Sequence, residues 1–228
     1  MKERGILFSA PMVKALRAGT KTQTRRPVKY PVLDGKMGWH PTPTGFEYLP
    51  GGSDRPVCPY GRSGDRLWVR ETFWAFGRWE TRFSEKKGRD EWHFIDMTVP
   101  MDRLYQFADP TPESLRHRSN ITPAWWKRPA IFMPRAASRI TLDIGAVRVE
   151  QLQDISYEDA IAEGMFDPAS APPFPFESKE TPEQHGRRTK YPQRAYCQLW
   201  EEINGAGSWD TNPWVWVVEF RKIELKQE

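Results

Sequence analysis

Residues 19–26 read Gly-Thr-Lys-Thr-Gln-Thr-Arg-Arg, and this stretch carries more information than any other part of the chain. Before it, Ser9 and a short apolar face predict a helix that ends at Gly19, where a left-handed residue is favoured. Within it, residues 22–25 alternate as a strand does, and Pro27 ends that strand. A lysine, several hydroxyls and two arginines therefore meet at a helix-to-strand turn. Such a turn is either a solvated basic loop or a functional site.

The remaining patterns predict a mixed α+β fold. Strands are expected over residues 6–8, 66–71, 140–149 and 214–223, and short helices over 156–163 and 193–203. A change in the alternating phase at Gly145-Ala146 predicts a bulge or tight bend in the third of these strands. Segments 30–60, 77–129 and 165–190 are rich in proline, glycine or irregular aromatic sequence, and we interpret them as insertions. We expect one domain over residues 1–228, with a small barrel-like sheet flanked by short helices.

Composition excludes several classes of protein. With 228 residues the chain can bury a core, while a charged fraction of 28% and a mean hydropathy of −0.73 are typical of a water-soluble chain. No apolar run approaches the roughly 20 residues of a membrane helix, and the first residues lack the pattern of a secretory signal. Two distant cysteines and four scattered histidines match no metal pattern. We therefore expect a cytoplasmic protein with no membrane partner, no metal and no cofactor.

Charge and aromatic content are compatible with a nucleic-acid partner. The formal net charge is +4, and several of the 11 tryptophans lie beside basic residues, as in residues 68–70, 78–79 and 125–128. Aromatic rings next to cations are suited to base stacking and phosphate contact. The alternative is that most of these tryptophans fill and cover a small core. Trp125 and Trp126 are accordingly either a stacking lid or a hydrophobic plug.

With these elements placed, the chain resembles the ASCH domain family, whose fold is related to PUA-type RNA-binding barrels. The matching motifs occur in the family's order and cover less than half of the chain. The most specific is the turn at residues 19–25. The others are Gly64-Asp65-Arg66-Leu67-Trp68-Val69, Ser156-Tyr157-Glu158-Asp159-Ala160-Ile161-Ala162-Glu163-Gly164, and the final strand at residues 214–220.

Within that family, small amidohydrolases that remove N4-acyl groups from cytidine use a lysine, a threonine and a glutamate. The resemblance places these on Lys21, Thr24 and Glu163. It implies a metal-independent hydrolase acting on a nucleoside or modified base. Those enzymes are about half as long as this chain and have no counterpart of its insertions, which leaves the substrate open.

Amide hydrolysis without a metal requires a nucleophile, a base and a proton donor. Thr24 can supply a nucleophilic hydroxyl, and Glu163 can protonate the leaving nitrogen. Lys21 acts as a base only when neutral, which requires burial or nearby cations such as Arg25 and Arg26. A regular strand would direct Lys21 and Thr24 to opposite faces, so they converge only if Lys21 still lies in the turn. Thr22 is the second candidate, as nucleophile or as a hydroxyl that holds Lys21.

The expected substrate-binding residues are Thr22, Arg25, Arg26, Trp68, Arg70 and Glu71. For Arg70 and Glu71 the alternative is that the two side chains pair with each other. Two other functions stay open. One is a non-catalytic reader of RNA or of a modified base that uses the PUA-like cleft, and the other is a ribonuclease that uses the same lysine.

Overall fold

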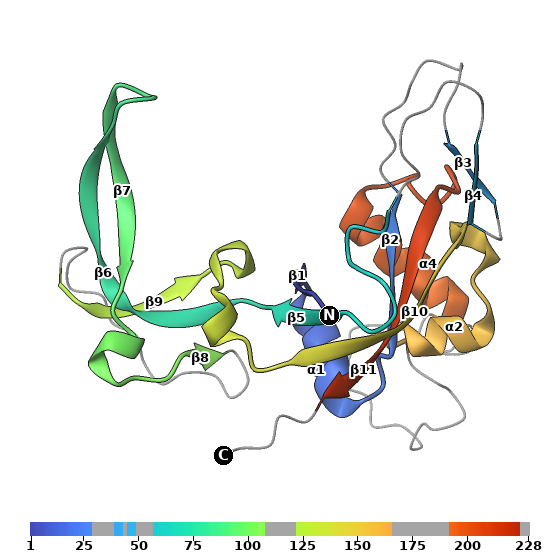
Figure 1. Ribbon diagram of the computed structural model, residues 1–228, viewed down its shortest axis with the longest axis horizontal. Coiled ribbons are helices and arrows are strands. Elements are labelled where there is room, and N and C mark those ends of the chain that lie inside the picture. Colours follow the sequence, from blue (N-terminus) through green and yellow to red (C-terminus); the bar gives the residue numbers. More distant parts are fainter. Residues whose placement is uncertain (29–38, 43–44, 49–56, 108–121, 166–191, 224–228) are drawn as a thin grey trace, which may run out of the picture. The chain divides into compact units, whose positions relative to one another are not determined.

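The computed structural model describes residues 1–28, 39–42, 45–48, 57–107, 122–165 and 192–223 (Figure 1). The chain is mixed α+β and divides into two compact units. Unit 1 comprises residues 1–4, 14–67 and 140–228, and unit 2 comprises residues 5–13 and 68–139.

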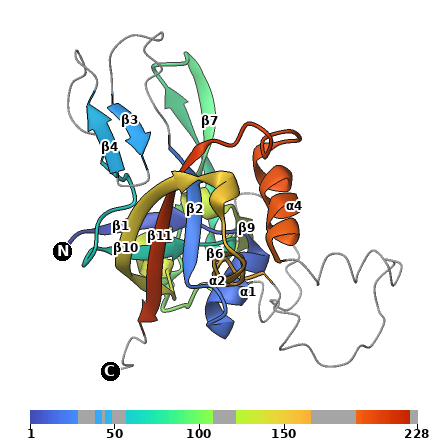
Figure 2. The same cartoon turned by 90° about the vertical axis from the view of Figure 1, so that its right-hand side faces the viewer.

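A five-stranded sheet organises unit 1. Its order is β1 (Glu3–Leu7), β5 (Arg66–Arg70), β10 (Thr141–Gln151), β11 (Trp214–Ile223) and β2 (Gln23–Pro27). Strands β1 and β5 begin in unit 1 and continue into unit 2, whereas β10, β11 and β2 lie side by side in unit 1 (Figure 2). The end strands β1 and β2 have one neighbour each among the described strands, so this part of the chain forms an open sheet and not a closed barrel.

The predicted irregularity in β10 is confirmed. Ile144 pairs with Phe220 and Ala146 pairs with Glu219, so Gly145 is the extra residue of a bulge. Because a bulge shifts the alternation by one position, the apolar residues before and after it stay on one face of the strand. The polar side chains after the bulge, at positions 148 and 150, therefore share the opposite face.

Three helices lie close to their predicted positions. Helix α1 (Ala10–Ala18) ends at Gly19, which has a φ of 75°. Helix α2 (Tyr157–Ala162) begins at Ser156, whose hydroxyl accepts a hydrogen bond from the Asp159 amide. Helix α4 (Pro192–Asn204) matches the third prediction.

A hydrophobic core joins α2 and α4 to β11. Its buried side chains are Leu152, Ile155, Ala160, Tyr196, Trp200, Val215 and Val217. The apolar stripe predicted for α4 is shorter than expected, because Ile203 is half exposed near the end of the helix. The same core face of β11 adjoins the charged site described below.

Unit 2 corrects the expectation of an irregular insertion over residues 77–129. It contains β6 (Phe73–Ser84), β7 (Arg89–Asp96), β8 (Gln106–Phe107) and β9 (Ala124–Arg128), with 3-10 turns at Val99–Met101, Ala130–Phe132 and Arg135–Ala137. Phe73, Ala75, Met133 and Ala137 form its buried core. The strands were missed because the outer part of the β6–β7 hairpin is exposed or only half-buried on both faces, so that its sequence lacks the run of apolar residues that marks a buried strand.

The other insertions are described only in part. Segment 30–60, expected to be a loop, contains a two-stranded hairpin of β3 (Trp39–Thr42) and β4 (Gly45–Tyr48). Weak periodicity and a proline within β3 concealed it. Residues 166–191 lie outside the described part of the chain, so the expected loop there stays a prediction. None of the described helices has the length and apolar character needed to span a membrane.

Asp65 gives unit 1 a specific sensitivity to acid. Its Oδ1 accepts the Lys2 backbone N–H at 2.7 Å and its Oδ2 accepts Arg4 Nη1 at 2.9 Å. These donors lower the pKa of Asp65 from 3.8 to about 2. Because the folded-state pKa lies below the unfolded one, the stabilisation is complete above pH 4 and is lost as the pH falls toward 2.

We therefore expect Asp65→Asn to lower the Tm at pH 7 and to leave it nearly unchanged at pH 2. Circular dichroism melting curves recorded between these pH values would measure the difference. Asp210→Asn, at an exposed position, is the matched control and should change the Tm little at any pH. Equal effects of the two substitutions at pH 7 would contradict the assignment.

Candidate active site

The predicted lysine and glutamate meet in unit 1 although 142 positions separate them. Lys21 and Glu163 form an isolated antiparallel bridge just before β2 and just after α2. Beside it, the Thr22 amide donates to the Ala162 carbonyl at 2.8 Å, and the Thr22 carbonyl accepts the Phe220 amide at 2.8 Å. Backbone hydrogen bonds therefore fix the turn between α2 and β11.

Two glycines make this approach possible. Gly19 ends α1 and Gly164 follows α2, and both adopt positive φ values, 75° and 89°. A Cβ on Gly164 would lie 3.0 Å from Ala15 Cβ and 3.2 Å from Lys21 Cβ. A larger residue there would be strained by its backbone conformation and would press on the lysine.

The lysine amine is buried and fully engaged by the glutamate. Lys21 Nζ donates to Glu163 Oε2 at 2.7 Å and to the Glu163 carbonyl oxygen at 2.8 Å. The side chains are 0% and 2% exposed. Burial lowers the pKa of Lys21 below 10.5; Glu163 opposes this shift, and the nearby guanidinium groups of Arg26 and Arg25 add to it. The direction is the one that a lysine base requires.

Arg25 links the glutamate to two further carboxylates. Its Nη1 lies 3.4 Å from Glu163 Oε1, its Nη2 donates to Asp159 Oδ2 at 2.8 Å, and its Nε donates to Glu150 Oε1 at 3.1 Å. Burial acts to lower the pKa of Arg25, but the carboxylates of Glu163 and Glu150 outweigh it and the net pKa is raised. The guanidinium stays charged and holds Glu163 Oε1, while Oε2 faces the lysine.

Arg148 extends the network outward. It donates to both carboxylate oxygens of Asp159 at 3.1 Å, to Glu150 Oε2 at 3.0 Å, and to Glu219. Burial acts to raise the pKa of Asp159, but Arg25 and Arg148 more than offset it, so that pKa is lowered. The sequence reasoning missed these outer residues. Two spacings in the sequence could have indicated them. Arg148 and Glu150 are two residues apart on a strand, and Asp159 and Glu163 are four residues apart at a helix, so each pair shares a face.

Cations and carboxylates nearly balance in this network. Three cations (Lys21, Arg25 and Arg148) alternate with four carboxylates (Glu150, Asp159, Glu163 and Glu219). With all seven ionised, the formal sum is −1. The arginines are therefore neutralised within the protein, and the network offers no excess positive charge to a phosphate.

Strand alternation decides where Thr24 lies. Lys21, Gln23 and Arg25 all contact α2 or the residue that follows it, so they share one face. Thr24 lies between Gln23 and Arg25 in a regular strand, opposite Val218 of β11, and its buried side chain belongs to the other face. The structure thus brings Lys21, Arg25 and Glu163 together and directs Thr24 away from them.

The other predicted residues near the turn differ in exposure. Thr22 is exposed, and its contacts described above are made by its backbone. Arg26 is half-buried on the Thr24 face and pairs in register with Trp216. Its contribution to the site is the electrostatic one on the pKa of Lys21.

Tyr196 of α4 is a site neighbour that the sequence placed only in an apolar stripe. Its ring is buried, and the Arg25 guanidinium lies 6.0 Å from the ring centroid. Burial, with help from the negative charge of Glu163, raises the pKa of Tyr196 well above 10.0. The phenol therefore stays protonated and available as a neutral hydrogen-bond donor.

Trp68, Arg70 and Glu71 belong to unit 2. Glu71 is buried and makes a bidentate pair with Arg139, at 2.9 Å from Nε to Oε1 and 3.0 Å from Nη2 to Oε2. Arg70 lies 5.3 Å from the Trp68 ring and donates to the Ile131 carbonyl. The alternative in which Arg70 and Glu71 pair with each other is therefore wrong.

Within the described residues, no group of three or more histidine, cysteine, aspartate or glutamate side chains is arranged to hold a metal ion. The three inner carboxylates of the site are each paired with a cation.

Comparisons of the chain with protein-family models, with curated proteins and with solved structures find no match. The ASCH resemblance therefore depends on the four sequence motifs alone.

Arg25 should contribute strongly to stability, because its loss leaves buried carboxylates without their shared cation. Removing one partner of a buried pair typically costs about 3–5 kcal/mol. We expect Arg25→Met to lower the free energy of unfolding by about that amount in urea titrations. The matched control is Arg221→Met, since the Arg221 side chain is 84% exposed in its pair with Asp143. That control should cost less than about 1 kcal/mol, and similar losses for both variants would contradict the network.

Proposed function

We propose that the chain is a metal-independent amidohydrolase that removes N4-acyl groups from cytidine or cytosine derivatives, on a PUA-like fold of the ASCH type. The observation that carries the proposal is the buried contact of 2.7 Å between Lys21 Nζ and Glu163 Oε2. The resemblance names the same lysine and glutamate, and they come from elements far apart in the chain. A solvated basic turn would not bury both groups.

The pair accounts for a complete proton cycle. A proton that moves along the hydrogen bond from Nζ to Oε2 converts the ion pair into a neutral amine and a carboxylic acid, a change that burial favours. The amine takes the proton of the nucleophilic hydroxyl as its oxygen bonds to the acyl carbon. The C–N4 bond then breaks, and the acid protonates the leaving N4. The ion pair is restored, and water hydrolyses the acyl ester by the same transfers in a second cycle.

The two parts of this mechanism have different support. Contacts, burial and the lowered pKa of Lys21 support the proton-transfer pair. The resemblance supports Thr24 as nucleophile, and the alternation of β2 argues against it. A water molecule activated by the same lysine would complete the hydrolysis in one cycle without an acyl ester.

The alternative reader of RNA or modified bases receives less support at this site. Phosphate binding requires uncompensated cations, and here Arg25 and Arg148 are held by carboxylates. The same argument weighs against a ribonuclease at Lys21, which would have to hold a phosphodiester.

The direct test is conversion of N4-acetylcytidine to cytidine by purified protein, followed by ultraviolet absorbance. We expect conversion by the native chain and a loss of at least about a hundredfold in kcat for Lys21→Ala and for Glu163→Gln, because each removes one proton-transfer group. Lys222→Ala, which removes an exposed lysine of β11, is the control. Absence of conversion at high enzyme concentration, or full activity of Lys21→Ala, would overturn the proposal.

Substitution of Thr24 separates the two nucleophiles. Thr24→Val keeps the shape and removes the hydroxyl, so it should abolish turnover if Thr24 forms an acyl ester. Thr24→Ser should then retain activity, and mass spectrometry should detect the acylated chain. Thr22→Val tests the second candidate nucleophile on the exposed neighbour. Full activity of both Thr24→Val and Thr22→Val would assign the attack to water.

The pH dependence follows from the lowered pKa of Lys21. The proposed cycle needs one proton on the Lys21–Glu163 pair, which Glu163 passes to N4, so kcat/KM should fall as rising pH removes that proton from Lys21. The midpoint of this fall should lie below 10.5. The Arg26→Gln variant removes one of the cations that lower this pKa, so its profile should shift to higher pH. An unshifted profile would show that another group controls the rate.

A further inference from the structure

The positive charge of the chain is concentrated in unit 2. This unit contains 13 lysines and arginines against 9 aspartates and glutamates, which equals the whole formal excess of +4. Unit 1 has 21 of each and is formally neutral. The amidohydrolase proposed above concerns unit 1, so this excess belongs to a part of the chain without an assigned role.

An aromatic stripe runs along one face of the β6–β7 hairpin in the same unit. Trp79 pairs with Phe94 across the strands, Thr81 with Trp92, and Phe83 with Asp90. Directly opposed residues share a face, so the four aromatic side chains lie on one side of the ribbon. Four residues of strand separate Trp79 from Phe83, a length of roughly 13 Å.

The stripe begins in the core of unit 2 and becomes exposed toward the hairpin end. The rings of Trp79 and Phe94 meet edge to face with centroids 5.4 Å apart. Trp92 is 54% exposed and Phe83 is 66% exposed. Beyond residue 77, β7 is the only partner of β6 among the described strands, so the far half is a two-stranded ribbon (Figure 1). The two outer rings contribute little to the core of the unit.

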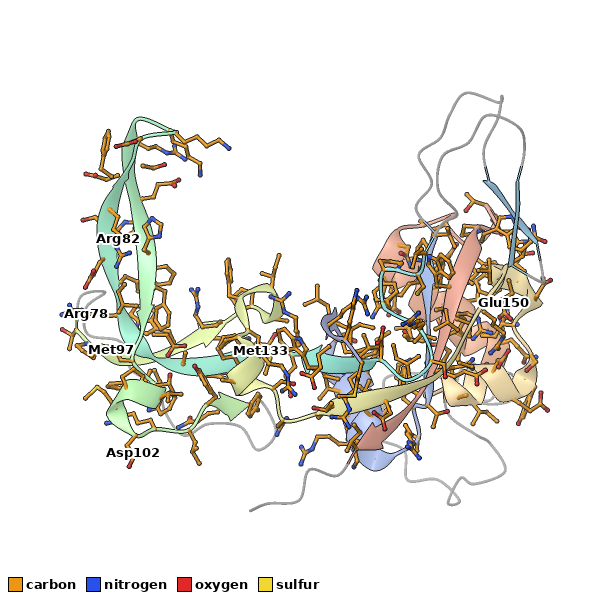
Figure 3. The ribbon with its side chains drawn as sticks, viewed as in Figure 1. Arg78, Arg82, Met97, Asp102, Met133 and Glu150 are labelled. Carbon is orange, nitrogen blue, oxygen red and sulfur yellow. The ribbon has the colours of Figure 1, made fainter. Side chains whose placement is uncertain are left out.

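Cations accompany the stripe. The Arg128 guanidinium lies 4.9 Å from the Trp79 ring, 4.5 Å from Phe94 and 4.7 Å from Phe132, which is itself 59% exposed. On the other face of the ribbon, Arg78 and Arg82 follow each other along β6 (Figure 3).

The charges on that other face are held loosely. Arg78, Arg82, Lys87 and Arg89 are paired with only two carboxylates, Glu80 and Glu91. All four cations are at least 45% exposed. Exposed pairs of this kind contribute about 0–1 kcal/mol, so a phosphate can replace either carboxylate.

We infer that this hairpin binds single-stranded nucleic acid, with unpaired bases stacked on Trp92 and Phe83. Arg128 beside the stripe, with Arg78 and Arg82 on the opposite face of the ribbon, attracts the phosphates. Every base has a flat π face, so exposed rings spaced along a strand bind single strands without requiring a particular sequence. The excess positive charge of unit 2 lies at residues 127–139 and includes Arg128 beside the stripe, whereas residues 77–96 carry five cations and five carboxylates. This charge favours a nucleic acid over an apolar protein surface, which would gain nothing from it. The inference does not depend on the proposed amidohydrolase.

The test is fluorescence anisotropy with a labelled 12-nucleotide oligouridylate, and with oligothymidylate in parallel to compare RNA with DNA. We expect binding by the native chain at 50 mM salt, weakening as salt rises. Since stacking contributes about 1–3 kcal/mol per base, the double variant Trp92→Ala, Phe83→Ala should weaken binding at least about thirtyfold. The ring-preserving pair Trp92→Phe, Phe83→Tyr should stay within about threefold of the native chain.

Leu104→Ala is the matched control, because Leu104 is an aliphatic side chain of unit 2 that is 86% exposed. It should leave binding unchanged. Thermal melting of the double variant should match the native chain, since both rings are exposed. Hydrolysis of free N4-acetylcytidine should also be unaffected, which separates this test from that of the proposed function.

Three outcomes would overturn the inference. The first is no binding of either oligonucleotide at 50 mM salt, and the second is unchanged binding by the double variant. The third is equal affinity for a 12-base-pair duplex, whose bases are not free to stack. If the double variant instead changes only the sedimentation of the chain, the stripe is an interface between copies.

Discussion

The structure of unit 1 depends on keeping a lysine amine out of water. An isolated buried ammonium would cost far more than the net stability of a domain, so it must be paired or lose its proton. Glu163 provides the partner, and Arg25 then compensates the second oxygen of that glutamate. Each further charged side chain pairs with one of opposite charge that lies closer to Lys21 in the network, and the series extends to Arg148 at its edge. The fold is arranged so that no member of this series is buried alone.

Backbone features, and not side-chain chemistry, set the positions of these charges. The helix-ending glycines bring the ends of α1 and α2 together, and the bulge at Gly145 turns two polar positions of β10 toward the network. The hydrophobic core beneath α2 and α4 shares that face of β11 and excludes water from it. Because water is excluded next to the apolar core, the pKa of the buried lysine can shift. The polar atoms of the network still find hydrogen-bond partners in one another.

The sequence was most informative where a local rule has one structural outcome. Glycine after a helix, serine before one, and a change of alternation in a strand each predicted the observed geometry at residues 19, 156 and 145. Alternation also indicated that Lys21 and Thr24 would face apart in a regular strand, while leaving open whether Lys21 lies in the turn. The alternation of polar and apolar residues did not reveal the strands of unit 2. Strands that are exposed on both faces need no apolar periodicity, and the contacts that order these strands lie between residues distant in sequence.

The candidate site shows the same limit. Lys21 and Glu163 were paired by resemblance, since nothing local in the chain connects positions so far apart. The roles of Glu150, Asp159 and Arg148 follow only from the tertiary contacts that close around Arg25. Single charged residues on a strand or helix look like solvated surface until the partner that buries them is known.

The separation of 142 residues between Lys21 and Glu163 has a consequence for how the chain can vary. Closing a loop costs entropy that grows only with the logarithm of its length, so doubling such a loop costs about 0.6 kcal/mol more. All of residues 68–139 lies inside this loop. This larger part of unit 2 could therefore be acquired between the two residues during evolution with little penalty to their pairing. The effect is on the folding rate instead, because contacts between residues so distant in sequence slow folding. During synthesis, Lys21 can pair with Glu163 only after the intervening segment has been made.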